Sequence, residues 1–408
     1  MNTGVHYMRE NTGFLILIAI FFIALLLPNS TLPQLIGYIA AALLYTFVLC
    51  YTLPRDTIMV IPNWVAATLT VIFLIAFYHL VATPRLGIVT RTIAFFGLIF
   101  TNLVYLPRII PERYFFAMFA RLSTVIVCIG FIPLIGPTAI FGFDLSLWPY
   151  QASVVSIQFN AITSIFSNPN VLGFLSLIGT ICAAVEYRLY DTQLSIGLFG
   201  VSLMGLIFTD YIGGWLVLIA LVILWLSYQI WGRSGVLGTT FVGGVCGVVI
   251  LAVVFDLLPG PYILQSQDLS NRKPLWLAGA AAFSQNPILG TGFGTADLMM
   301  EPFLDRLEGY SPHNSFLRMF IETGLIGGGA YLSIHVLAIT QTARAITDER
   351  SFFLFGFVVI AVITQMFETF SIFGLSMRST IVTLGIGYAI HNITIQRSEV
   401  RTGSHKME

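Results

Sequence analysis

One histidine and two arginines lie near the boundary between a hydrophilic segment and an apolar one. His313 comes just before an apolar run, Arg318 lies about one helical turn into that run, and Arg272 lies earlier in the hydrophilic segment. Histidine can accept a proton near neutral pH because its unperturbed pKa is about 6.5. Arginine presents a planar fork of N–H donors to phosphate or carboxylate oxygens. Together these residue types can bind an anionic group and take a proton from a hydroxyl.

The same hydrophilic segment contains an Ala-rich stretch followed by three alternating glycines. The Ala-rich stretch predicts a short helix that Pro274 starts and that the Asn-Pro pair at 286–287 ends. Gly290, Gly292 and Gly294 allow the backbone to come close to a ligand or to another segment. They do not form a dinucleotide fingerprint, because no strand precedes them.

The elements that must hold these residues cross a membrane. The chain has 408 residues, of which 57% are hydrophobic and 9% charged, whereas a soluble domain carries roughly 25% charged residues. A helical span needs about 20 apolar residues. Twelve candidate spans lie near residues 12–28, 33–53, 62–82, 86–106, 114–136, 170–187, 193–209, 213–231, 236–257, 316–341, 352–370 and 376–393. Because backbone in lipid must satisfy its own hydrogen bonds, we predict an all-α polytopic bundle, a single transmembrane domain over 1–408 with one large loop at 258–315.

Positive charge in the short loops indicates the orientation, because Lys and Arg favour the cytoplasmic side. With the N-terminus in the cytoplasm, the inside segments hold most loop arginines, including Arg233 and Arg344, and the outside segment 137–169 has no Lys or Arg. We therefore predict that both termini are cytoplasmic and that the 258–315 loop faces outside.

Cysteines and acidic residues give no sign of a metal site. The four cysteines lie inside apolar stretches without metal-ligand spacing, and the carboxylates of the 258–315 loop form no recognised motif. We expect no metal and no cofactor.

Four motifs follow one another from the loop into the next predicted span. They are Arg-x-x-x-Trp from Arg272, Asn-Pro-x-x-Gly-x-Gly-x-Gly from Asn286, His-Asn-x-x-Leu from His313 and Glu-x-Gly-x-x-Gly from Glu322. In this order, between predicted spans, they resemble the O-antigen ligase and polymerase superfamily. One feature differs: superfamily members commonly carry an arginine at the outer start of the eighth span, where this sequence has Ile212. Either another arginine supplies that charge or the donor site differs.

The resemblance implies a glycosyltransferase of the bacterial inner membrane, built like other membrane enzymes that use lipid-linked sugars. The donor would be an undecaprenyl-diphosphate-linked glycan at the periplasmic face. Ligases of the superfamily transfer the glycan to a sugar hydroxyl of lipid A-core, and polymerases transfer it to another lipid-linked repeat unit. Membrane lipid is an expected partner and nucleic acid is not.

The resemblance also implies roles for individual residues. His313 matches the superfamily's loop histidine and is the candidate base, since base catalysis activates a weakly nucleophilic hydroxyl. Arg272 matches its loop arginine and is a candidate catalytic residue. The candidate ligands of the donor diphosphate are Arg272, Arg318 and Arg91, because arginine can stabilise the charge of a leaving diphosphate. Residues expected to support the site are Asn314, Glu322, which can pair with Arg318 at i,i+4, Gly290, Gly292 and Gly294.

Three functions compete for this pattern. An O-antigen ligase is the first reading and a polysaccharide polymerase the second. A multi-pass transporter or flippase also suits twelve spans, but a transporter would more often place its site near the midplane between matched halves. The sequence shows no internal repeat, and its polar residues concentrate in one loop. A purely structural membrane partner would leave the His, Arg and Gly pattern without an explanation.

Overall fold

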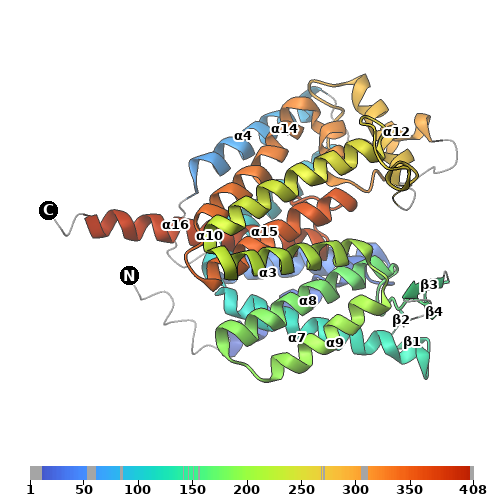
Figure 1. Ribbon diagram of the computed structural model, residues 1–408. Coiled ribbons are helices and arrows are strands. Elements are labelled where there is room, and N and C mark those ends of the chain that lie inside the picture. Colours follow the sequence, from blue (N-terminus) through green and yellow to red (C-terminus); the bar gives the residue numbers. More distant parts are fainter. Residues whose placement is uncertain are drawn as a thin grey trace. The chain divides into compact units, whose positions relative to one another are not determined.

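The computed structural model describes residues 12–52, 61–82, 86–140, 142–145, 147–149, 151–154, 157–267, 269, 272–304 and 311–404. Helices make up most of the described chain (Figure 1). The strands among these residues form two short antiparallel hairpins, β1 (Ala139–Ile140) with β2 (Phe143–Asp144) and β3 (Gln151–Val154) with β4 (Ile157–Asn160). The prediction of an all-α polytopic membrane protein is therefore confirmed.

Among the described residues, eight helical stretches are long and apolar enough to cross a membrane. They are α3 (Gln34–Thr52), α4 (Asn63–Ala82), Arg91–Ile109 within α5 (Leu86–Ile99), η2 (Phe100–Tyr105) and α6 (Leu106–Ile109), then α7 (Glu112–Phe131) with η3 (Ile132–Leu134), α8 (Pro169–Tyr190), α10 (Ile212–Val254), α14 (Ser315–Arg344) and α15 (Glu349–Phe367). Shorter apolar stretches are α2 (Thr12–Ala24) with η1 (Leu27–Asn29), and α9 (Leu194–Phe208). The last helix is α16 (Met377–Ser404). The number of twelve spans stays a prediction.

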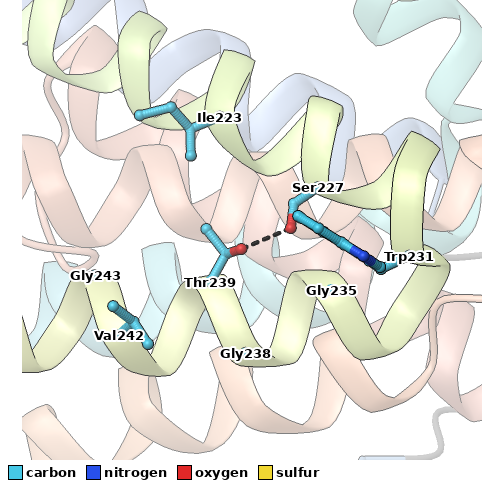
Figure 2. A pocket seen from close by; sticks show the side chains of 8 residues that line it. All are labelled: Ile223, Ser227, Trp231, Gly235, Gly238, Thr239, Val242 and Gly243. Atoms are coloured by element: carbon cyan, nitrogen blue, oxygen red, sulfur yellow. Dashed lines mark hydrogen bonds between the residues drawn. The ribbon is translucent and has the colours of Figure 1, made fainter.

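Helix α10 turns back on itself at one glycine. Gly232 has φ 59° and ψ −147°, which is not helical, and such a left-handed φ suits glycine. The two arms then lie side by side, joined by a hydrogen bond of 2.6 Å between the Ser227 and Thr239 hydroxyls (Figure 2). The crevice between the arms encloses about 450 Å³. The turn falls between the predicted spans near 213–231 and 236–257.

The chain forms two compact units, each built from separate stretches. The first unit consists of Met1–Ile58, Leu106–Trp215 and Leu375–Ile381, and the second of Met59–Tyr105, Leu216–Gly374 and Val382–Glu408. In the first unit α7, α8 and α9 pack together, and an ion pair of 2.9 Å joins Arg121 to the buried Glu186. The expectation of a single transmembrane domain stays a prediction.

The second unit holds every predicted site residue. Its helix α14 packs against α4 and α15 (Figure 1). The loop between α10 and α14 contains α11 (Tyr262–Gln265), α12 (Arg272–Gln285), α13 (Ala296–Met300) and η4 (Glu301–Phe303). The helix predicted for the Ala-rich stretch is thus confirmed as α12, which begins at Arg272, two residues before Pro274, and ends just before Asn286-Pro287. The indole of Trp276 in α12 stacks on Phe255 at 5.6 Å between ring centroids, which fixes α12 on the end of α10.

Candidate active site

Arg272, the first residue of α12, is attached to the end of α15. Its Nε donates to the Phe367 carbonyl at 3.1 Å, and its Nη1 donates to the Leu269 carbonyl at 3.3 Å. Its Nη2 lies 3.7 Å from Oε1 of Glu368, whose side chain is 3% exposed. These contacts fix the guanidinium beside residues 367–370, called here the 367–370 segment.

His313 is held against the same 367–370 segment from both sides. The Ser311 hydroxyl pairs with the Thr369 hydroxyl at 2.9 Å. The Ser315 hydroxyl lies 2.7 Å from the Glu368 carbonyl and 2.6 Å from the Phe370 carbonyl. His313 therefore shares one support with Arg272.

Two backbone features shape the turn into α14. His313 has φ 44°, a left-handed value that few residues other than glycine adopt. Asn314 then caps α14, because its side-chain oxygen accepts from the Leu317 amide at 3.0 Å. The turn presents His313 at the start of α14, and Asn314 supports it by capping the first turn of that helix.

Arg318 lies in the first turns of α14 between two carboxylates. Its Nε donates to Oε1 of Glu322 at 2.9 Å, so the predicted i,i+4 pair is confirmed. Its Nη2 lies 3.9 Å from Oδ2 of Asp297. The Glu322 side chain is 3% exposed and the Arg318 side chain 21% exposed. The guanidinium is thus fixed from its buried side and remains partly open on the other.

The three glycines belong to residues 286–294, called here the glycine segment, which pack on a kink of α14. Gly324 has φ 64° and ψ −167°, so α14 bends there. The bend frees backbone groups that pair with the segment: the Gly292 amide donates to the Glu322 carbonyl at 2.8 Å, and the Leu325 amide donates to the Pro287 carbonyl at 2.7 Å. A Cβ on Gly290 would lie 2.5 Å from the Gly324 nitrogen. Glycine is required at 290 because the two backbones touch.

The other face of the glycine segment contacts α4 and α5. His79 Nε2 lies 2.8 Å from the Leu289 carbonyl and therefore donates to it. Arg91 Nη1 donates to the Gly294 carbonyl at 2.9 Å, and a Cβ on Gly294 would overlap the Arg91 guanidinium. Arg91 thus binds the segment that packs beside Arg318, and its role toward a diphosphate stays a prediction.

The structure adds partners that the sequence did not reveal. Glu368 falls inside the predicted span near 352–370, but α15 ends at Phe367, which leaves Glu368 at the helix end beside Arg272. His79 lies within the predicted span near 62–82, and nothing in the sequence indicated its contact with Leu289. Asp297 of α13 approaches Arg318, a contact that no sequence motif indicated. Within the ranges that the structure describes, no group of three or more His, Cys, Asp or Glu residues is arranged to hold a metal ion.

Comparison with known proteins supports the family resemblance. The sequence model of the family described as O-Antigen ligase matches residues 197–332, a range that contains α10, α12, the glycine segment, His313 and Arg318. Over this range the chain is similar to the O-antigen ligase family, which supports the resemblance to the O-antigen ligase and polymerase superfamily. A curated relative, the exopolysaccharide production protein ExoQ of Rhizobium meliloti (strain 1021), is 33% identical over 128 residues. That match covers 28% of this chain and 29% of ExoQ.

Proposed function

We propose that this protein is a member of the O-antigen ligase and polymerase superfamily and a membrane glycosyltransferase that transfers a glycan from undecaprenyl diphosphate to a sugar hydroxyl. One observation carries the proposal: Arg272 and His313 share the 367–370 segment as their support, and Arg318 lies one turn beyond His313 in α14. The separate predicted residues thereby belong to one end of the second unit.

The arginines are suited to a diphosphate leaving group. Negative charge grows on the diphosphate as the sugar bond breaks, and donors fixed in advance stabilise that charge without reorganising. Glu322 takes one of the five N–H groups of Arg318. The remaining groups on the partly exposed side can bind phosphate oxygens, while the buried carboxylate holds the plane of the fork.

His313 is suited to activating the acceptor hydroxyl. A positioned base that removes the hydroxyl proton contributes typically 10²–10⁴-fold. The hydroxyl bonds of Ser311 and Ser315 fix the backbone on both sides of His313, and a left-handed φ at a non-glycine residue is a form of strain that clusters at functional sites.

We assign lipid A-core as the acceptor and the periplasmic face as the location. In the second unit Arg233 Nη1 donates to the Arg344 carbonyl at 3.2 Å, at the end of α14 opposite to Ser315. Arginines at that end favour a cytoplasmic position for it, with the 258–315 loop in the periplasm and both termini in the cytoplasm. The name of the relative ExoQ, an exopolysaccharide production protein, favours a polymerase as the second candidate.

The test compares the wild type with His313→Gln in detergent, and His391→Gln in α16 is the matched control. Each protein receives an undecaprenyl-diphosphate glycan and lipid A-core, and the product is followed by gel mobility. We expect the wild type and the control to glycosylate lipid A-core, and His313→Gln to lose about 10²–10⁴-fold in rate while it still binds the donor. A longer lipid-linked glycan as the product would favour the polymerase. Movement of the lipid-linked sugar across vesicles without any transfer would refute both.

A further inference from the structure

A cavity of about 570 Å³ lies on the α4 side of the glycine segment. Its walls come from the end of α4 with Tyr78 and His79, the end of α12 with Gln285, the glycine segment, and α13 with Leu298 and Met299. The volume falls in the range of 300–1,000 Å³ that is typical of small-molecule sites. No residue of α14 is among the described residues that line it, so it is separate from the arginine site.

The charge of the lining restricts the ligand. Lys, Arg, Asp and Glu are absent from the described residues that line the cavity. Arg91 points its Nη1 at the Gly294 carbonyl, and Arg318 points its Nε at Glu322. A phosphate or carboxylate would meet no Lys or Arg among the described residues that line the cavity, which favours an uncharged ligand.

The lining combines amide groups with apolar surface. Gln285 and Asn286 are exposed and offer both donors and acceptors. Ile88, Leu298 and Met299 provide apolar walls, next to the ring of Tyr78. A sugar ring has hydroxyls around its edge and C–H groups on its faces, and it matches this combination. A hydrocarbon chain would instead bury the two amides without partners.

The glycine segment links the cavity to the arginine site. Thr291 lines the cavity, and its amide and hydroxyl each lie 3.2 Å from the Ile321 carbonyl of α14, three residues beyond Arg318. A ligand in the cavity therefore contacts the segment on which the start of α14 packs.

We propose that this cavity binds an uncharged saccharide unit of the glycan substrates. The inference rests on the proposed function in one respect: that function supplies the reason why the protein meets a glycan. The sugar belongs either to the donor or to the acceptor, and both present the same chemistry.

The test measures binding of a free, lipid-less repeat-unit oligosaccharide to the full-length protein in detergent by calorimetry. The variant Gln285→Leu/Asn286→Leu removes both amides at exposed positions, and Ser284→Ala, in the same helix turn but outside the cavity lining, is the control. We expect Kd to rise about five- to fiftyfold in the double variant and to stay unchanged in the control. His313→Gln should bind the oligosaccharide as the wild type does.

Transfer kinetics on the same proteins separate the outcomes. A raised KM for the acceptor assigns the cavity to the acceptor sugar, and a raised KM for the donor assigns it to the donor sugar. Unchanged oligosaccharide binding and unchanged KM values in the double variant would overturn the cavity assignment, as would displacement of the oligosaccharide by a sugar-free polyprenyl phosphate. A wild type that binds the oligosaccharide in the cavity but transfers nothing would overturn the proposed function alone.

Discussion

Variants of the ion pair between Arg318 and Glu322 can separate the contribution of Arg318 to stability from its contribution to glycan transfer. In Arg318→Gln, the Glu322 carboxylate, 3% exposed, loses its hydrogen-bonded cation, and an uncompensated buried charge costs about 3–5 kcal/mol. Hydrogen bonds to a charged diphosphate are worth about 1.5–3 kcal/mol each. Losing one of them lowers kcat/KM roughly 10- to 100-fold.

The double variant Arg318→Gln/Glu322→Gln removes the carboxylate together with the guanidinium. We expect it to regain most of the free energy of unfolding that Arg318→Gln loses, because two neutral amides can pair in nearly the same volume. Transfer should stay low, since no guanidinium remains to meet the diphosphate. Denaturant titration followed by tryptophan fluorescence gives the stability, and glycan transfer is measured on the same samples.

The control is the ion pair of the first unit, Arg121 with Glu186, whose carboxylate side chain is 5% exposed. Arg121→Gln should cost stability in the same way but leave kcat/KM of the folded protein at the wild-type value. If the double variant Arg318→Gln/Glu322→Gln recovers transfer along with stability, Arg318 serves only to neutralise Glu322, and its assignment to the diphosphate is wrong.

Two further predictions concern backbone geometry and a helix cap. Gly290→Ala places a Cβ against the backbone of α14 at a residue with φ +73°, and it should lower the free energy of unfolding by about 1–3 kcal/mol. The control is Gly329→Ala in α14, where a Cβ would meet nothing within 4 Å and should raise the free energy of unfolding by up to about 1 kcal/mol. Equal melting temperatures for the two variants would contradict the contact at Gly290. Burial opposes ionisation of the Asp348 carboxyl, but its hydrogen bonds from Ser351, with Arg350 nearby, outweigh burial and lower its pKa. Asp348→Ala should therefore lower the free energy of unfolding by about 0.5–2 kcal/mol above pH of about 4. The difference in stability between the wild type and the variant should vanish as the pH falls through the lowered pKa of the folded protein. A difference in stability that persists in acid would show that the charge of Asp348 plays no part.

Local patterns in the sequence were enough to predict the parts of the site that lie on one element. The Ala-rich run and its Asn-Pro end predicted α12, and the spacing of four residues predicted the pair of Arg318 with Glu322. Both predictions depend on helical periodicity, which can be recognised from residues close together in the sequence.

Contacts between distant elements were not predictable in the same way. Arg272 meets the carbonyl of Phe367 across 95 residues, and His79 meets Leu289 across 210 residues. A histidine inside an apolar run has the same local pattern whether it packs or donates to a loop. The predicted span near 352–370 also ran past the end of α15 at Phe367, and this placed Glu368 inside a span and not at a helix end.

The glycine segment also sets an order of events during synthesis. It contacts helices made long before it and a helix made after it: His79 precedes Leu289 by 210 residues and Arg91 precedes Gly294 by 203, whereas the Thr291 hydroxyl meets the Ile321 carbonyl only 30 residues later. At about 5–20 residues per second, the ribosome makes the glycine segment roughly 10–40 s after it makes the end of α4. Since a buried polar group without a partner is costly in lipid, we expect the ends of α4 and α5 that carry His79 and Arg91 to stay hydrated through that interval, until the glycine segment is made.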